Sequence, residues 1–578
     1  MFNDIYCAVE IEEMLEARER RSERQRRLQR THKMPLLSFT MNIAGEYKRS
    51  FAIDKAFDTG AALIMDRLSS AGIAPAAIEQ YDEKTGCQLL MALPADAMLV
   101  KRLMTDIEEM APIGRLFDID VLAPGGEKLS RSDMGVAKRR CIICGKEAFI
   151  CSRSRAHSAD ELRREIERML SDYFNGKLCG LISSMAIRSL MYEVAVTPKP
   201  GLVDRFNNGS HRDMDFFSFI DSACALSGYF REAALAGITR TALSPAELFS
   251  SLRWPGMLAE AGMLKSTGGV NTHKGAIFSI GILCAALGRL AARGAGWSPE
   301  SLSSLSRAMA SGPALEELSR ITSENAATTG ERLYHSKQIT GVRGEAASGF
   351  ASALKYGLPT LMELTAQGKG PDEAGSAALT RLMAWVTDTN VISRSSIEQH
   401  SRLQSQLRLR LKQGEIPLPE LLEIDSDYIS ENISPGGCAD LLAVCFLMMF
   451  AGQTSVFPDD ISGYTPEALG RMLGHPLTYE GEATTNGYVS DGYYITIRCQ
   501  MEIKQLGGDC AARLIIQDNI YPCLASFDSP SLIRCLLPNP PKQEPHGFVQ
   551  LEIHSLCPDG QRSEKLRFAL SLLKGRGL

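Results

Sequence analysis

The sequence predicts a multidomain protein with an N-terminal α/β domain, a central all-α domain and a small β-rich C-terminal domain. The chain has 578 residues, of which 44% are hydrophobic, and this is enough for about three to four domains. The spacing of the apolar residues changes twice along the chain, and no internal repeat is found. We therefore expect domains at residues 1–165, 176–452 and 453–578.

Residues 1–165 combine a charged helical start with three strand-like pieces. PLLSFTMNI (35–43), QLLMALP (88–94) and GRLFDIDVL (114–122) are short apolar runs rich in strand-forming residues. Helical and strand-like segments mixed in this way are typical of an α/β domain.

From residue 176 onward the apolar residues follow a helical spacing, as at Leu178, Leu181, Ile182 and Met185. The stretch LLAVCFLMMFA (441–451) is too short to span a bilayer and predicts a buried helix. After residue 453, alternation between turns predicts strands in 493–503, 512–517 and 548–556.

Charge and composition exclude several classes of protein. A net charge of -5 gives no overall attraction to nucleic acid or to anionic lipid, so we expect neither as a partner. The first residues lack the order of a signal peptide, and no uncharged apolar run reaches about 18 residues. Fifteen scattered cysteines favour reduced thiols. These features predict a cytoplasmic protein that does not enter a membrane.

The stretch VTPKPGLVDRFNNGSHRDMD (196–215) is too broken to be a helix, because its prolines and glycines favour turns. It nevertheless carries seven ionisable residues. Cations that bind phosphate oxygens, carboxylates that bind Mg²⁺ and an imidazole that moves protons are the parts of a site for a polyanion and a metal. A solvated polar loop is the alternative interpretation. The seven residues are Lys199, Asp204, Arg205, His211, Arg212, Asp213 and Asp215.

A second stretch, KSTGGVNTHKGAIFSIGILCAALGRL (265–290), runs from a glycine turn into a long apolar helix. Asn271 or Thr272 can cap this helix, which places Lys274 in its first turn. Free backbone N–H groups and the helix dipole favour an anion there. The P-loop pattern of nucleotide triphosphatases is absent. The alternative is an ordinary capped helix with Lys274 in solvent.

These two stretches, together with GVRGEAASGF (341–350), DTNVISR (388–394) and ISPGGCADLLA (433–443), resemble the triphosphoribosyl-dephospho-CoA synthases. The resemblance spans about residues 176–452. It implies that the 2′-hydroxyl of 3′-dephospho-CoA attacks C1 of the ribose of ATP, with inversion and with loss of adenine. This chain departs from the family pattern DTNVLHRGG at three positions. Ser393 replaces the histidine, and Ser395 and Ser396 replace the glycines.

An inverting displacement needs a base on one face of the sugar and an acid or hydrogen-bond donor near the leaving group. On motif membership, Asp204 or His211 is the candidate base, and Glu345 or Asp388 is the candidate contact to the adenine or the ribose. Asp213 and Asp215 are expected to share Mg²⁺. The expected nucleotide-binding residues are Lys199, Arg205, Asn271, His273, Lys274 and Arg343.

In the first region, Asp118 and Asp120 alternate along a predicted strand, so their side chains share one face with Cα atoms about 7 Å apart. Two such carboxylates can hold one Mg²⁺ over a phosphate, although an exposed edge strand gives the same pattern. Four segments of the first region, in this order, resemble holo-citrate lyase synthase, a nucleotidyltransferase-like enzyme. They are ERRSERQRRL (19–28), PLLSFTMNIAGEYKRS (35–50), the predicted strand GRLFDIDVL (114–122) and RRCIICGKEAFICSRSRAH (139–157).

That resemblance implies transfer of the finished group to a serine of the acyl carrier protein subunit of citrate lyase, with release of pyrophosphate. Asp118 and Asp120 would hold the metal, and Arg115, Arg153 and Arg155 would face the phosphates. Malonate decarboxylase is the alternative recipient. A protein that binds CoA-like nucleotides without turnover is a further alternative, and no family is recognised for 453–578.

Two other features of the first region have alternative interpretations. Residues 16–33 hold seven arginines against three glutamates; a solvated helix face or a phosphate-contacting arm is favoured over a nucleic-acid patch. Cys141, Cys144, Cys151 and His157 begin with one CxxC pair and could bind zinc, but the remaining spacings are irregular. The resemblance carries these cysteines without implying a metal, so reduced thiols are favoured and zinc is the alternative.

Overall fold

The computed structural model describes residues 8–322, 326 and 329–454, and the backbone of seven strands between 481 and 573. The chain divides into two compact units. One covers residues 174–458, and the other contains residues 2–173 together with 459–578. Helix α5 (Ala159–Ala195) is continuous across position 174, so the predicted boundary between residues 165 and 176 falls inside one helix.

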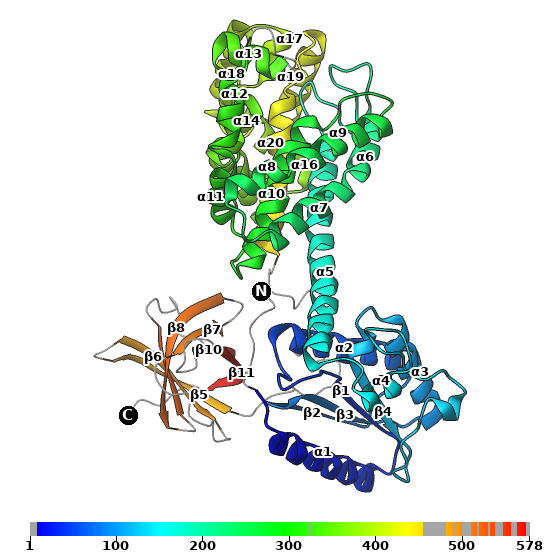
Figure 1. Cartoon of the computed structure of the whole chain (residues 1–578). Helices are drawn as coiled ribbons and strands as arrows, with labels where there is room; N and C mark the ends of the chain where they lie inside the picture. The colour runs from blue at the N-terminus through cyan, green and yellow to red at the C-terminus, as the bar shows by residue number, and fades with distance from the viewer. Residues whose placement is uncertain are drawn as a thin grey trace. The chain divides into compact units, whose positions relative to one another are not determined.

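The first region contains a four-stranded sheet in the order β2-β3-β1-β4 (Figure 1). Its helices and strands, in chain order, are α1 (Ile11–His32), β1 (Leu36–Met41), α2 (Phe51–Ser70), β2 (Ala77–Glu83), β3 (Gly86–Ala92), α3 (Ala97–Met110), β4 (Phe117–Leu122) and α4 (Ala148–Ser154). All strand pairs are antiparallel, which corrects the α/β expectation to an antiparallel sheet covered by helices.

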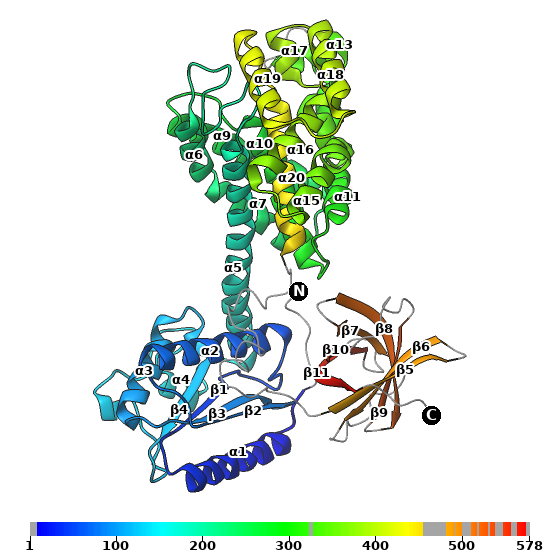
Figure 2. The ribbon, with the colours of Figure 1, turned by 180° about the vertical axis from the view of Figure 1, so that it is seen from behind.

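Alternation along the strands gives the sheet two different faces. On one face, Phe39 of β1 stacks on Phe57 of α2 with ring centroids 4.8 Å apart. On the other face, Leu36 and Leu90 pack against Leu28 of α1. Figure 2 shows α1 on one side of the sheet and α2 on the other. The second face therefore also carries Asp118 and Asp120, because Asp120 is opposite Ser38 in the β1–β4 register.

The unit that contains residues 174–458 is helical throughout its described part, as the apolar spacing predicts. After α5 come α6 (Phe216–Ala225), α7 (Ser227–Thr239), α8 (Pro245–Ser251), α9 (Arg253–Ser266), α10 (Lys274–Ala292), α11 (Pro299–Ala310), α12 (Pro313–Ser319), α13 (Thr329–Lys337), α14 (Gly341–Ser348), a π-helical turn (Ala353–Gly357), α15 (Leu358–Ala366), α16 (Pro371–Trp385), α17 (Thr389–Arg394), α18 (Ile397–Leu411), α19 (Leu418–Ser430) and α20 (Gly436–Gln453).

Two apolar helices, α10 and α20, form the centre of this unit. Nearly every side chain of α10 from Ala276 to Ala291 is buried, and the 441–451 stretch lies inside α20, buried as predicted. By length and composition alone, α5, α10 and α20 could each cross a membrane, although 83% of the most apolar window of α10 is buried in the unit. The sequence analysis predicted no membrane-spanning segment because it considered only apolar runs without charged residues, whereas these helices include a few.

The strands after residue 480 pair into a closed barrel in the order β10-β11-β5-β6-β9-β8-β7. They are β5 (Gly481–Val489), β6 (Gly492–Cys499), β7 (Cys510–Ile516), β8 (Asn519–Ser529), β9 (Leu532–Leu537), β10 (Gly547–Leu556) and β11 (Ser563–Leu573). Residues 500–503 and 517 of the predicted strands lie outside the described residues.

Candidate functional site

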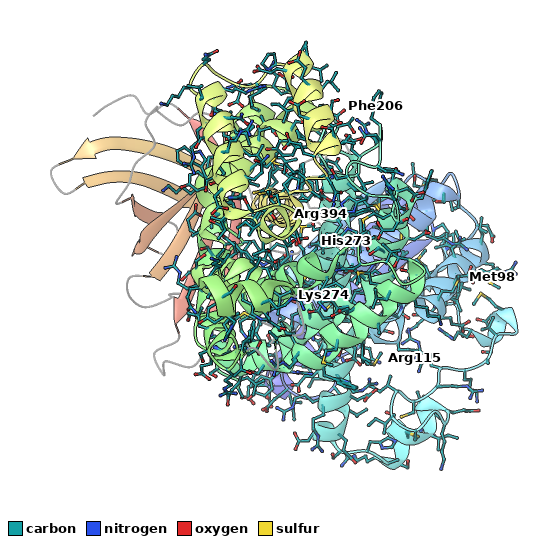
Figure 3. The ribbon with its side chains drawn as sticks, turned by 90° about the horizontal axis from the view of Figure 1, so that it is seen from above. Met98, Arg115, Phe206, His273, Lys274 and Arg394 are labelled. Carbon is teal, nitrogen blue, oxygen red and sulfur yellow. The ribbon has the colours of Figure 1, made fainter. Side chains whose placement is uncertain are left out.

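The helical unit contains a cavity of about 1310 Å³ between the start of α10 and the start of α20. The broken loop 196–215 and the segments 338–352 and 385–394 complete its wall. All five segments of the synthase resemblance therefore meet at one cavity. Figure 3 labels His273 and Lys274 at the start of α10 and Arg394 at the end of α17, and all three line the cavity.

The charged loop is held in place by buried carboxylates. Asp204, only 2% exposed, accepts hydrogen bonds from the backbone N–H groups of Lys199, Phe206 and Asn207. Asp425 on α19 accepts from the backbone of Gly201. Asp204 lies outside the cavity wall, and its oxygens already serve the loop. The prediction that Asp204 is a candidate base is therefore corrected: it shapes the loop.

Two further predicted residues also lie outside the cavity wall. The guanidinium of Arg205 pairs with Asp372 at the start of α16. Asp215 is the N-cap of α6 and accepts a hydrogen bond from the backbone of Ser218 at 2.8 Å, and this bond lowers its pKa. Asp213 does line the cavity. The predicted Asp213–Asp215 metal pair is therefore not assembled, because a cap position holds one carboxylate away.

Lys199 reaches the cavity but is paired inside the protein. Its ammonium lies 2.5 Å from the carboxylate of Glu193 on α5, and both side chains are buried. Burial raises the pKa of Glu193, and the ammonium opposes that shift. A buried pair of this kind cannot lose one partner cheaply, since the other charge is left without compensation.

We expect Lys199→Met to lower the free energy of unfolding of the helical unit by about 3–5 kcal/mol, because Glu193 loses its partner. The double variant Glu193→Leu/Lys199→Met should regain most of that loss. Urea unfolding of the three proteins checks this expectation. A single variant as stable as the wild type would contradict the buried pair.

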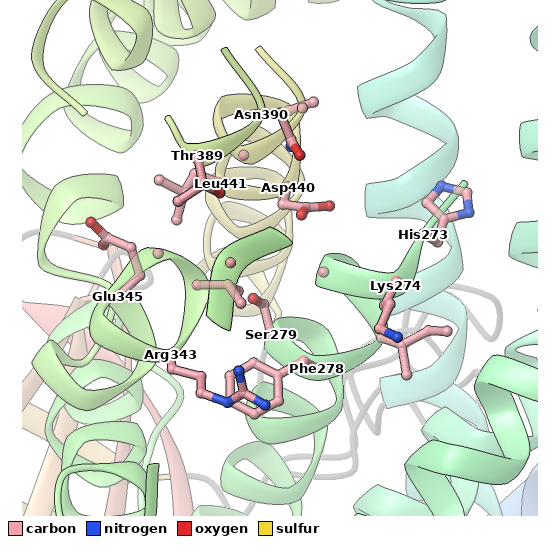
Figure 4. Close-up of a pocket in the computed structure, with 18 of the residues that line it drawn as sticks. His273, Lys274, Phe278, Ser279, Arg343, Glu345, Thr389, Asn390, Asp440 and Leu441 are labelled. Carbon is pink, nitrogen blue, oxygen red and sulfur yellow. The ribbon is translucent and has the colours of Figure 1, made fainter. Parts of the chain in front are cut away.

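The start of α10 already holds a carboxyl group. The carboxylate of Asp440 on α20 accepts a hydrogen bond from the backbone of Ala276 and lies against Gly275. Figure 4 shows Asp440 in the cavity near the beginning of α10. Burial, Glu193 and Asp388 together raise the pKa of Asp440 well above its usual value. The predicted phosphate cradle is thus occupied by a side chain that sequence reasoning missed.

Gly275 is needed for this contact, because a Cβ there would overlap the carboxylate of Asp440. We expect Gly275→Ala to displace Asp440 and to destabilise the helical unit by about 1–3 kcal/mol, as overpacking does. Gly262→Ala in α9 is the matched control, since its Cβ would meet nothing within 4 Å. Thermal unfolding measures both. Equal midpoints for the two variants would contradict the contact.

His273 presents an unpaired ring nitrogen. It is 2% exposed, and its Nδ1 lies 2.7 Å from the hydroxyl of Ser222, which also accepts a hydrogen bond from Thr272. Ser222 therefore donates to Nδ1 and the ring proton is on Nε2. Nε2 is buried and has no hydrogen-bond partner in the described part of the chain. Burial, with a contribution from Lys199, lowers the pKa of His273 to about 3, so the ring is a neutral donor.

A second imidazole, His211, also lines the cavity. Its Nε2 lies 2.9 Å from the hydroxyl of Ser434, and its Nδ1 lies 3.3 Å from the guanidinium of Arg394. Burial and the charge of Arg394 lower the pKa of His211. The ring is therefore held neutral, the form that accepts a proton.

Two further carboxylates line the wall, one buried (Asp388) and one half-buried (Glu345). Asp388 caps α17 through the backbone of Asn390 and Val391, and its second oxygen accepts from Cys438 at the start of α20. It thus joins two helix starts. Glu345 accepts from the hydroxyl of Ser352 at 2.6 Å, and burial raises its pKa. A carboxyl group with a raised pKa is suited to donate a proton.

The remaining predicted cations line the cavity and are paired with carboxylates. Lys274, 47% exposed, pairs with Glu260, and its backbone N–H donates to Asn271. Arg343 lies near Glu317 and Glu331. These exposed or half-buried pairs cost little to open, so a polyanion can replace the carboxylates.

In the first region, Asp118 and Asp120 lie on the same face of β4, as predicted. The ammonium of Lys128 lies 2.6 Å from Asp120, and the guanidinium of Arg139 lies 3.6 Å from Asp118. Burial and the neighbouring Asp120 raise the pKa of Asp118. A carboxylate whose proton affinity is raised by a second carboxylate beside it is suited to share a divalent cation.

The surroundings of this pair were only partly predicted. Arg115 is half-buried next to Arg139, and both burial and that charge lower its pKa. Arg153 and Arg155 are exposed on and after α4, where Arg153 lies over the ring of Phe149. Sequence reasoning missed Arg139 and Lys128, since neither lies next to the carboxylates in the chain. The feature of the sequence that could have indicated them is a basic residue in each of the segments that follow β4.

Comparison with known proteins adds an independent observation. A family described as apo-citrate lyase phosphoribosyl-dephospho-CoA transferase matches residues 9–173, and one described as ATP:dephospho-CoA triphosphoribosyl transferase matches residues 179–456. Protein CitXG of Haemophilus influenzae is 33% identical over 458 residues, which cover 77% of this chain and 97% of that protein. The chain belongs to the CitXG family.

Other relatives agree with this membership. Protein CitXG of Leuconostoc mesenteroides is 32% identical over 461 residues, covering 76% of this chain and 97% of that protein. The 2-(5″-triphosphoribosyl)-3′-dephosphocoenzyme-A synthase of Pectobacterium atrosepticum is 43% identical over 267 residues, covering 46% of this chain and 88% of that protein. The transferase match thus covers the Asp118–Asp120 pair, and the synthase match covers the lining of the helical cavity.

Proposed function

We propose that this CitXG chain makes and attaches the prosthetic group of citrate lyase. The helical unit converts ATP and 3′-dephospho-CoA into 2′-(5″-triphosphoribosyl)-3′-dephospho-CoA and adenine. The first region transfers that product to a serine of the apo acyl carrier protein subunit and releases pyrophosphate. The observation that carries the proposal is the meeting of all the synthase motifs at one cavity, in a chain that also matches the transferase family.

In the synthase reaction, the 2′-oxygen bonds to C1 of the ribose while the bond from C1 to adenine breaks. His211 accepts the 2′-hydroxyl proton on Nδ1, where the substrate hydroxyl would replace the 3.3 Å contact from Arg394, because its neutral ring lines the cavity while Asp204 does not. Glu345 supplies a proton or hydrogen bond to the leaving adenine. The unpaired Nε2–H of His273 donates to a substrate oxygen. These roles rest on placement, protonation and hydrogen bonding.

The charge of the cavity supports a role for Mg²⁺. Its wall holds six lysines and arginines and seven aspartates and glutamates, so these residues do not by themselves provide an excess of positive charge for a triphosphate. Asp440 lies at the start of α10, where phosphate oxygens and a carboxylate could share one cation. We therefore place Mg²⁺ at Asp440 in preference to Asp213 and Asp215. Lys274 and Arg343 would contact the phosphates directly.

In the transferase reaction, the serine oxygen of the carrier protein bonds to the phosphorus nearest the sugar, and the bond to pyrophosphate breaks. Positioning and charge neutralisation provide most of the catalysis in such a step. Asp118 and Asp120 would hold Mg²⁺, and Arg115 and Arg139 would face the phosphates. Arg153 in α4 and Arg155 directly after it remain predicted contacts to the phosphates.

The domain layout is part of the proposal. We assign residues 1–165 to the transferase, 176–452 to the synthase and 453–578 to a β-rich domain of unassigned role. The family matches at 9–173 and 179–456 support the first two, and the pairing of β5 to β11 supports the third. A cytoplasmic location fits the free cysteines of the described residues.

Incubation of the full chain with ATP, 3′-dephospho-CoA and apo acyl carrier protein tests this function. We expect free adenine, pyrophosphate and a carrier protein heavier by the phosphoribosyl-dephospho-CoA group. Apo carrier protein of malonate decarboxylase in a parallel reaction tests the alternative recipient. Nucleotide binding without adenine release would overturn the proposal and leave a non-catalytic binding protein.

A further inference from the structure

Three cysteines and one histidine gather at one point of the first region, away from the Asp118–Asp120 pair in the chain. The sulfur atoms of Cys141, Cys144 and Cys151 and a ring nitrogen of His157 all lie within 4.8 Å of one another. The sulfurs of Cys144 and Cys151 are 3.4 Å apart, and all three cysteines are free. Tetrahedral zinc with Zn–S bonds near 2.3 Å holds its sulfurs about 3.8 Å apart, so small movements complete the site.

The backbone around the first two cysteines forms a tight hairpin. Arg140 and Glu147 form an antiparallel bridge, and the backbone N–H of Cys141 donates to the carbonyl of Lys146 at 2.6 Å. Gly145 turns the chain with a φ of 70°, and the backbone of Lys146 donates to the sulfur of Cys144. This turn directs both sulfurs of the CxxC pair to the same point, as a zinc knuckle does.

The histidine supplies an independent observation. Nε2 of His157 is buried and makes no hydrogen bond of normal geometry within the described part of the chain, and the side chain interacts with the thiol of Cys144 inside the cluster. A buried ring nitrogen without a partner is costly, whereas a metal ligand is satisfied by the ion. The next residue, Ser158, begins α5 by donating its backbone N–H to Glu161, and this bond fixes the position of the histidine.

The segment also has little apolar core. Between residues 132 and 160 the only buried side chains are those of Cys141 and Cys151. Phe149 and Ile150, the large apolar residues of α4, are 59% and 55% exposed. A segment with so little apolar core usually needs a disulfide or a structural metal to keep one conformation.

We propose that Cys141, Cys144, Cys151 and His157 bind one structural zinc ion in a Cys₃His site. Binding takes up Zn²⁺ and releases the thiol protons, and the four ligands leave no open position for catalysis. The ion would fix the segment that begins at Arg139, whose guanidinium bonds to Glu108 and to the carbonyl of Phe117. Zinc would thereby hold Arg139 beside Asp118. The proposal corrects the preference for unliganded thiols that sequence spacing gave.

The test is the metal content of the full chain, purified with a phosphine reductant and without chelator. We expect about one zinc per chain in the wild type. Cys144→Ser and His157→Ala should each weaken zinc binding by more than about 100-fold, measured by competition with a chromogenic chelator. Cys224→Ser is the matched control, because Cys224 is an exposed free cysteine outside the cluster.

A second measurement covers variants that fold poorly. Wild-type chain reconstituted with Co²⁺ should show the intense visible absorption of tetrahedral cobalt and a thiolate-to-cobalt charge-transfer band. Adenine release by the helical unit should be unchanged in Cys144→Ser, while transfer to the carrier protein falls. Less than a tenth of an equivalent of bound zinc, a six-coordinate cobalt spectrum, or a Cys144–Cys151 disulfide in the reduced preparation would overturn the proposal.

Discussion

Replacing Asp118 and Asp120 together by asparagine should lower the rate of transfer to the carrier protein by a factor on the order of 1,000. The pair lies on one face of β4, and burial together with Asp120 raises the pKa of Asp118. Asparagine keeps the size of each side chain but removes the charge that a divalent cation needs. The mass of the carrier protein, followed over time with preformed triphosphoribosyl-dephospho-CoA, measures the loss.

The same variant separates the two activities. Adenine release from ATP and dephospho-CoA should be unchanged, since Asp118 and Asp120 are absent from the wall of the helical cavity. Asp66→Asn, an exposed carboxylate on α2, is the matched control and should transfer at the wild-type rate. Transfer within tenfold of wild type in the double variant would remove these carboxylates from the transferase site.

Lys274→Ala should raise the KM for ATP by about 10- to 100-fold, the value of one charge-assisted hydrogen bond. Lys274 lies at the start of α10 in the cavity wall, and its pair with Glu260 is half exposed and cheap to open. The variant should be as stable as the wild type, because the half-exposed pair with Glu260 contributes little to the free energy of unfolding. Initial rates of adenine release over a range of ATP concentrations give the KM.

Lys265→Ala is the control for this substitution, because Lys265 is exposed near the end of α9 and outside the cavity wall. We expect no change in its KM. A Lys274→Ala protein with an unchanged KM and an unchanged rate would show that the start of α10 does not contact the triphosphate.

The sequence predicted the periodic parts of the fold well. Helical spacing located the all-α region, and the apolar 441–451 stretch is the buried core of α20. Strand β2 was missed, because its sequence AIEQYDE is charged and its residues are half-buried or exposed, so no apolar alternation marks it as a strand. The boundary near 165–176 has no break in secondary structure to mark it, because α5 carries one helical pattern through it.

Site residues were predicted less well, because residue type shows charge but does not show the partner. Asp204 and Asp215 have the right chemistry, yet backbone N–H groups engage both carboxylates. Asp440 was missed, although a lone carboxylate near the start of an apolar helix was a usable signal. The Cys₃His cluster depends on a hairpin and on α4, which irregular spacing does not reveal.

The central claim is that the helical cavity grips the phosphates of ATP so that C1 of the sugar is the electrophile. A single-turnover reaction with the full chain, ATP and dephospho-CoA, without carrier protein, tests it most directly by mass spectrometry and NMR. We predict one adenine per product, a product that keeps all three phosphates, and an α-configured C1. Release of pyrophosphate or phosphate with adenine still bound to the sugar would contradict the claim.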